Sequence, residues 1–291
     1  MRFDYYAATI DAPPQVIIET LKQLGNELQD ATSLARSYRY QQGFKIHHER
    51  EGTAATICTG GNGPRTLAFA SGQNTDAFVE LVRSEWKDAH FVTRADPAQD
   101  FIEPKSYDKL QRVCKTIAKQ NRLQFPAFSD SLNPKAGRTQ YIGSPKSNYR
   151  ARLYEKGYEQ LSRMKWHPEN FYFQTPEGQL VSPDNWVRLE LQVRPQDDAA
   201  KFLAAHSAPE QFWGFSNWTH ELAQKAFALE LERITLRQHK HLANDVKLKW
   251  MCKMYGNALQ NLYNDVGSWS AVGMNIGDIL KELNDKRRMG A

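Results

Sequence analysis

A tyrosine among basic residues is the feature of this sequence that most strongly suggests chemistry. Residues 149–156 read YRARLYEK, and in an extended strand the side chains of alternate residues share one face. Alternation places Tyr154 beside three cations, Arg150, Arg152 and Lys156. Such cations lower the pKa of a phenol, hold a phosphate and stabilise a pentavalent phosphorus centre, so the pattern predicts a tyrosine that attacks a phosphodiester. A solvated basic strand whose tyrosine only packs fits the pattern equally well.

A second alternating segment offers oxygen ligands for a metal ion. Residues 186–194 read WVRLELQVR, which predicts a strand with Glu190 and Gln192 on its polar face. Carboxylate and amide oxygens suit Mg²⁺ or Mn²⁺, which polarise the scissile phosphate in nucleases. The same alternation is also typical of an antiparallel strand with one wet face and no ligand.

Further carboxylates follow a predicted strand at residues 90–94. Asp96 and Asp100 lie just beyond it, and both are candidates to join Glu190 around one cation, with Asp4 in the first predicted strand as a weaker candidate. Asp96 precedes Pro97, however, and an acid at that position is also typical of a turn. By local sequence alone the turn is the better interpretation of Asp96.

The elements that must position these residues indicate an α+β fold with an antiparallel sheet. Alternating apolar residues and glycine-marked turns predict strands at 3–10, within 38–71, and in a hairpin over 137–159. Helical periodicity predicts helices at 15–25, 76–87 and 106–121. After Pro195 the pattern becomes helical, so we expect an α+β nicking-joining domain over 1–200 and a mainly helical DNA-binding or supporting region over 201–291.

Composition narrows the class of protein. The 291 residues carry a net charge of +5 and an isoelectric point near 9.0, which favours a polyanionic partner. No apolar run approaches the roughly 20 residues of a membrane span, so we expect no membrane association. Three widely spaced cysteines argue for a reducing compartment, and we expect a cytoplasmic protein.

Taken together, four segments resemble the replication initiation factor family, the Rep-trans class of rolling-circle replication initiators. The segments are the opening FDYYAATI, the block VTRADPAQDF, the hairpin TQYIGSPKSNYRARLYEKGYE and the strand WVRLELQVRP. They occur in the family's order over residues 1–195, and the hairpin and the glutamate-containing strand are the specific part. The short chain and its opening look most like the phage or prophage members. Relaxases of mobile elements use the same chemistry and stay an alternative, as does a non-catalytic DNA-binding regulator.

The resemblance implies an enzyme that nicks one DNA strand at an origin, becomes joined to the 5′ phosphate through tyrosine, and later rejoins the displaced strand. It implies Tyr154 as nucleophile with Lys156 beside it, and Mg²⁺ or Mn²⁺ as cofactor. The implied metal ligands are Glu190 and Asp96, with Asp100 and Gln192 as further candidates. The residues that would contact phosphate or DNA are Arg150, Arg152, Lys146, Arg188 and Arg194.

Some choices stay open at this point. Tyr149 and Tyr158 flank Tyr154 and compete with it for the role of nucleophile. The implied partners are DNA, as an origin hairpin or a single-stranded segment, together with a host helicase and polymerase. The sequence is compatible with a monomer or a dimer.

Overall fold

The fold was analysed in a computed structural model of the chain. It describes residues 1–49, 52–61, 63–130, 132–133, 136–164, 171–175, 178–227 and 236–289. By their contacts the residues divide into two units, Met1–His239 and Lys240–Ala291. The first unit contains the helices that follow the predicted boundary at residue 200, and the functional division proposed at that boundary stays a prediction.

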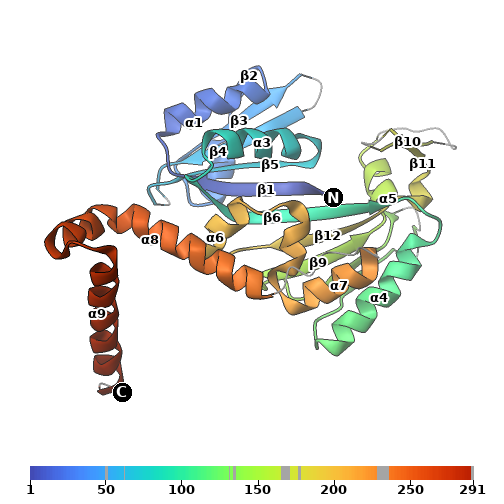
Figure 1. The fold of residues 1–291 in the computed structure, drawn as a ribbon. Helices are drawn as coiled ribbons and strands as arrows, with labels where there is room; N and C mark the ends of the chain where they lie inside the picture. The colour runs from blue at the N-terminus through green and yellow to red at the C-terminus, as the bar shows by residue number, and fades with distance from the viewer. Residues whose placement is uncertain are drawn as a thin grey trace. The chain divides into compact units, whose positions relative to one another are not determined.

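The centre of the first unit is an antiparallel sheet of ten strands, in the order β2-β3-β4-β5-β1-β6-β12-β9-β8-β7 (Figure 1). One half holds β2 (Glu27–Asp30), β3 (Gln42–His48), β4 (Gly52–Thr59), β5 (Thr66–Ser71) and β1 (Arg2–Ile10). The other half holds β6 (His90–Phe101), β12 (Val187–Val193), β9 (Tyr149–Tyr154), β8 (Thr139–Ile142) and β7 (Ala127–Phe128). A separate two-stranded ribbon pairs β10 (Phe173–Gln174) with β11 (Leu180–Val181).

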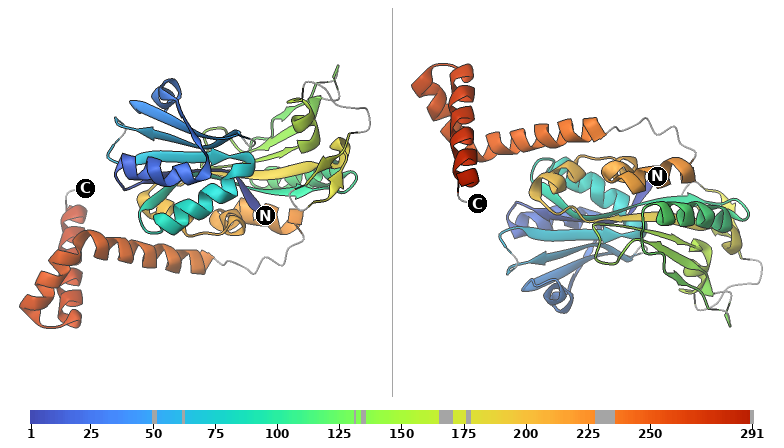
Figure 2. Two further views of the ribbon diagram at one scale, coloured as in Figure 1. Left: turned by 90° about the horizontal axis from the view of Figure 1, so that it is seen from above. Right: turned by 90° about the horizontal axis from the view of Figure 1, so that it is seen from below.

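Helices cover one face of this sheet and leave most of the other face open. The main core joins apolar side chains of the strands to those of α1 (Pro14–Leu21), α3 (Thr75–Glu85), α4 (Ser106–Gln120), α6 (Asp198–Ala205) and α7 (Asn217–Phe227), with the 3₁₀ segment η5 (Pro209–Phe215) (Figures 1 and 2). A smaller cluster on the opposite face holds Ala35 of α2 (Thr32–Ser37). We call this second side of the sheet the open face.

Short helical segments complete the described part of the chain. The 3₁₀ segments are η1 (Lys22–Leu24), η2 (Gly72–Asn74) and η4 (Pro183–Asn185), and α5 (Lys156–Leu161) follows β9. The second unit consists of most of α8 (Leu236–Val266) and of α9 (Trp269–Met289). Within the described residues no helix has the length and apolarity to span a membrane.

These elements confirm the predicted α+β class, with an antiparallel sheet followed by helices. Two local differences matter for the site. The strand expected at 90–94 continues as β6 to Phe101, so Asp96 and Asp100 lie within a strand and the turn interpretation of Asp96 is wrong. Pro97 fits inside β6 because it pairs with Phe3, where the register with β1 shifts.

The second difference concerns Lys156. β9 ends at Tyr154, and Lys156 begins α5, so it does not share a strand face with Tyr154 as the alternation predicts. Just after this turn Gly157 passes against the backbone of Pro183, where a Cβ atom would lie 2.3 Å from the carbonyl oxygen, so the close approach requires glycine. Lys156 therefore approaches the tyrosine from a helix.

Candidate active site

Tyr154 lies at the end of β9, on the open face. In the ladder between β9 and β12, Tyr154 is opposite Arg188, Arg152 is opposite Glu190, and Arg150 is opposite Gln192. Residues that alternate with them, such as Leu153 and Leu189, enter the main core on the other face. The register therefore brings the basic strand and the glutamate strand together on one side of the sheet.

The phenol of Tyr154 is covered by its neighbours. Tyr154 is only 2% exposed, and its hydroxyl donates a hydrogen bond of 3.4 Å to Oε2 of Glu190. Arg152 donates to the same oxygen at 2.8 Å, and its guanidinium lies 4.0 Å from the centre of the Tyr154 ring. Arg152 thus covers both the phenol and the carboxylate, and its outward movement would expose both.

Electrostatics at Tyr154 differ from the sequence-based expectation. Burial raises the pKa of the phenol well above its usual value, and the nearby carboxylate of Glu190 raises it further. Arg188 and Arg152 lower that pKa, but they offset the other effects only in part. The sequence predicts that the surrounding cations lower the pKa of Tyr154, but the net shift of that pKa is upward, so the prediction is wrong. The hydroxyl is therefore protonated at neutral pH.

Lys156 contacts the site from the first turn of α5. Its ammonium nitrogen lies 5.7 Å from the centre of the Tyr154 ring and donates to Oε2 of Glu159 at 2.8 Å. Burial lowers the pKa of Lys156, and the charge of Arg188 lowers it further. A lysine with a lowered pKa releases its proton more readily than an exposed one.

Arg188 is enclosed by carboxylates rather than exposed to solvent. The residue is 0% exposed, and its guanidinium donates to both oxygens of Asp100, at 2.6 and 2.7 Å, and to Oδ1 of Asp4. These bonds use Nε, Nη1 and Nη2, so the guanidinium is not placed for the DNA contact implied for Arg188. They also occupy Asp100, which makes it a poor metal ligand in this arrangement.

Asp96 is the most perturbed carboxyl of the site. It is 1% exposed and forms a bidentate ion pair with Arg94, two residues earlier on the same face of β6. Burial raises the pKa of Asp96 to about 7, although Arg94 lowers it, and the charges of Glu190 and Asp4 add to the increase. Asp4, Asp96 and Glu190 thus form an acidic cluster whose members repel one another.

The acidic cluster has the donor chemistry for a hard divalent cation, because it offers carboxylate oxygens from three neighbouring strands. Each of its carboxylates is paired with a guanidinium group: Asp4 with Arg188, Asp96 with Arg94, and Glu190 with Arg152. Within the described residues, no three acidic, histidine or cysteine side chains converge closely enough to hold a metal ion. Arg94 and Arg152 would have to turn outward before a cation could replace them, and both are partly exposed.

The remaining predicted contacts lie toward the opposite end of the hairpin. Lys146 is exposed in the turn between β8 and β9, and Nη1 of Arg194 donates to the carbonyl of Pro145 at 3.0 Å. The guanidinium of Arg150 lies 3.9 Å from the centre of the Tyr141 ring. A strand rises about 3.3 Å per residue, so the turn is on the order of 15 Å from Tyr154, too far to contact the same phosphate.

The structure separates the three candidate tyrosines. Tyr149 points to the helix-covered face, where it packs against the main core. The hydroxyl of Tyr158, in α5, donates to Oδ1 of Asp184. Among the three, Tyr154 is the one whose hydroxyl bonds to a residue of the acidic cluster.

Several supporting residues were not predicted from sequence. Arg138 bonds Glu155 through its backbone amide and its guanidinium, at 2.7 to 3.1 Å, and also bonds Asp108 at 2.8 Å. These bonds anchor the end of β9 to α4. Arg94 could have been recognised, because a basic residue two positions before Asp96 shares its strand face. The sequence carries no comparable signal for the pairing of Arg138 with Glu155.

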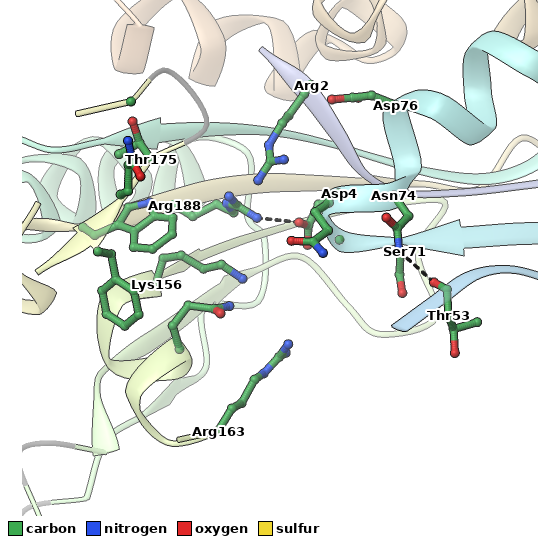
Figure 3. Close-up of a pocket in the computed structure, with 17 residues that line it drawn as sticks. Arg2, Asp4, Thr53, Ser71, Asn74, Asp76, Lys156, Arg163, Thr175 and Arg188 are labelled. Carbon is green, nitrogen blue, oxygen red and sulfur yellow. Dashed lines mark hydrogen bonds and ion pairs between the residues drawn. The ribbon is translucent and has the colours of Figure 1, made fainter. Parts of the chain in front are cut away.

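A large cavity adjoins this site. It has a volume of about 1010 Å³ and reaches from Arg188, Asp4 and Lys156 toward the start of β4 and the end of β5 (Figure 3). It lies beside the acidic cluster, at the end of the sheet where β1 begins. Space for a ligand is therefore present beside Asp4, Lys156 and Arg188, the residues that separate it from Tyr154.

Comparisons with known proteins add a likeness among solved structures. No family model matches the chain, and no curated protein matches it. Among solved structures, the chain is similar to a rolling circle replication initiator protein from Geobacillus stearothermophilus, with a TM-score of 0.44 and 20% sequence identity. The similarity covers 68% of this chain and 75% of that one.

Proposed function

We propose that this chain is an enzyme that nicks and rejoins one strand of DNA, with Tyr154 as nucleophile, and that it initiates rolling-circle replication of the phage or prophage type. The observation that carries the proposal is the hydrogen bond from the Tyr154 hydroxyl to Glu190, on an open sheet face that also holds Arg152, with Lys156 approaching from α5. Two of the four family-like segments, the hairpin and the glutamate-containing strand, contain these same residues.

The first step is an in-line transfer. A DNA phosphate that binds Arg152 draws its guanidinium away from Glu190 and uncovers the phenol. The oxygen of Tyr154 then attacks phosphorus while its proton leaves along the hydrogen bond to Glu190 and passes to solvent, so that Glu190 stays ionised. The bond from phosphorus to the 3′ oxygen breaks, and Lys156, whose pKa is lowered, can supply the proton that this oxygen takes up.

The second step reverses the first. A 3′ hydroxyl attacks the phosphotyrosine, restores a phosphodiester and releases the Tyr154 oxygen, which regains a proton. Protein and DNA are unchanged in charge and oxidation state over the two steps. Between them the free 3′ end primes synthesis, which would require a helicase and a polymerase of the host.

A divalent cation, Mg²⁺ or Mn²⁺, would be held by Asp96 and Glu190 and would polarise a non-bridging phosphate oxygen. The mutual repulsion within the acidic cluster supports this assignment, because a cation there would offset it. Asp100, bonded through both oxygens to Arg188, is less suited to the role.

Covalent capture tests the proposal. The purified chain would be incubated with Mn²⁺ and single-stranded circular DNA of the replicon beside its gene, then run on a denaturing gel. We expect a denaturant-stable protein–DNA adduct that is lost in Tyr154→Phe and with a chelator, and is kept in Tyr149→Phe and Tyr158→Phe. Equal adduct from Tyr154→Phe would refute the assignment of the nucleophile. DNA binding without any adduct would instead indicate a non-catalytic regulator.

A further inference from the structure

The cavity beside the acidic cluster is built from several elements that meet at one end of the sheet. Its lining comes from the starts of β1 and β4, the end of β5, the beginning of α3, α5 and the β10–β11 ribbon (Figure 3). Its volume of about 1010 Å³ is at the upper end of the range of roughly 300–1,000 Å³ for small-molecule pockets. A cavity of this size suits a segment of a polymer better than one small ligand.

The lining is rich in cations that approach from different elements. Arg2 and Lys156 extend into the cavity from β1 and α5, and Arg163 extends toward it from beyond the end of α5 (Figure 3). Among the described residues Arg2 has no carboxylate within ion-pair distance. Burial raises the pKa of Asp76, which lines the same cavity, but the charge of Arg2 lowers that pKa. Lys156 and Arg163 share a single carboxylate, that of Glu159. The lining itself carries four cations (Arg2, Lys156, Arg163 and Arg188) and two carboxylates (Asp4 and Asp76), and the side chain of Arg163 is 69% exposed.

An aromatic wall closes one side of the cavity. Phe173 of β10 and Trp186, just before β12, both line it, with ring centres 5.4 Å apart and planes at 60°. Phe171 packs edge-on against Phe173 at 4.8 Å and supports that ring from outside the lining. Nε1 of Trp186 has no hydrogen-bond partner among the described residues. A flat, partly exposed phenyl ring beside cations is the arrangement on which a nucleic-acid base stacks.

Groups that can read the edge of a base complete the lining. Asp76 at the start of α3 can accept from the amino group of a base, and the amides of Gln160 and Gln174 can both donate and accept. Cations, an aromatic wall and polar edge-reading groups thus surround one space. A hydrophobic ligand would gain little from such a lining.

We infer that this cavity binds single-stranded DNA next to the scissile phosphate, with phosphates held by Arg2 and Arg163 and a base stacked on Phe173. The inference rests on the proposed function, since Lys156 and Arg188 connect the cavity to the site of Tyr154. It assigns the cavity to the nucleotides that flank the nick, and so makes Asp76 and the two glutamines candidates for selecting the sequence that is cut.

The test measures binding separately from catalysis. The full chain carrying Tyr154→Phe would be titrated into a fluorescein-labelled single-stranded DNA of mixed sequence, about 16 nucleotides long, and anisotropy read at several salt concentrations. Arg2→Gln or Arg163→Gln should each weaken binding and reduce the slope of log affinity against log salt by about 0.7, the value for one phosphate contact on a single strand. Phe173→Leu should weaken binding roughly fivefold or more and leave the slope unchanged.

Arg112→Gln is the matched control, because Arg112 is an exposed arginine of α4, which covers the other face of the sheet. It should bind as the parent does. Unchanged affinity in the three cavity variants, or equal losses in Arg112→Gln, would overturn the inference. Equally tight binding of a duplex, weakened by the same variants, would also overturn it. Losses confined to the cavity variants, in a chain that forms no covalent adduct, would support the binding site while contradicting the proposed nicking activity.

Discussion

Replacing Asp96 by asparagine should change how the stability of the protein depends on pH. The pKa of Asp96 rises from 3.8 to about 7 on folding, chiefly because the carboxyl is buried. Each pKa unit corresponds to about 1.36 kcal/mol, so the shift amounts to an energetic cost on the order of 4 kcal/mol for the ionised group. This cost is a net value, because it already includes the effect of Arg94, which lowers the pKa of Asp96.

The sign follows from counting protons. Below about pH 4 the carboxyl is protonated in both the folded and the unfolded chain, and the cost is absent. Between about pH 4 and pH 7 the unfolded chain has released the proton that the folded chain retains, so the free energy of unfolding falls as the pH rises. Above about pH 7 the full cost is present. The Asp96→Asn variant carries no such cost, since the amide that replaces the carboxyl is neutral at every pH.

The assay is urea unfolding followed by tryptophan fluorescence, for wild type and Asp96→Asn, from about pH 4 to about pH 8. Relative to wild type, the free energy of unfolding of Asp96→Asn should increase by on the order of 4 kcal/mol as the pH is raised over that range. Asp11→Asn, at an exposed position just after β1, controls for the loss of one carboxylate. A difference between wild type and Asp96→Asn that stays constant with pH, or that moves in favour of wild type, would refute the reasoning.

Three further expectations follow from the same site. Because carboxylates must be deprotonated to bind a cation, Mn²⁺ should raise the melting temperature more at about pH 8 than at about pH 5, and equal increases would contradict a site in the acidic cluster. Arg188→Met should lower the free energy of unfolding by about 3–5 kcal/mol, measured by urea, since it leaves Asp4 and Asp100 without their counter-ion; a loss below about 1 kcal/mol would show that the network contributes little. Gly157→Ala should cost about 1–3 kcal/mol by thermal unfolding, because its Cβ would lie 2.3 Å from the carbonyl oxygen of Pro183, and an unchanged melting temperature would argue against that close approach.

Local patterns in the sequence predicted much of the sheet. The alternation in 186–194 correctly separated the core residues of β12 from the polar face that carries Glu190, because side chains of a strand alternate whatever its neighbours are. Turn residues correctly predicted the hairpin that ends in Tyr154. Such features depend on the conformational preferences of a few consecutive residues, so the local sequence is enough to predict them.

Other features of the site depend on which strands become neighbours. Asp4 reaches Arg188 because the register between β1 and β6 shifts at this position, and β12 pairs with β6 although the two are far apart in sequence. The raised pKa values of Tyr154 and Asp96 come from burial, which no short segment specifies. The sequence by itself determined the residue types and the strand faces that they occupy. Only the tertiary structure decided which residues become partners, how deeply they are buried and hence which of them are charged. The reason is that these properties arise from contacts between strands that are far apart in the sequence.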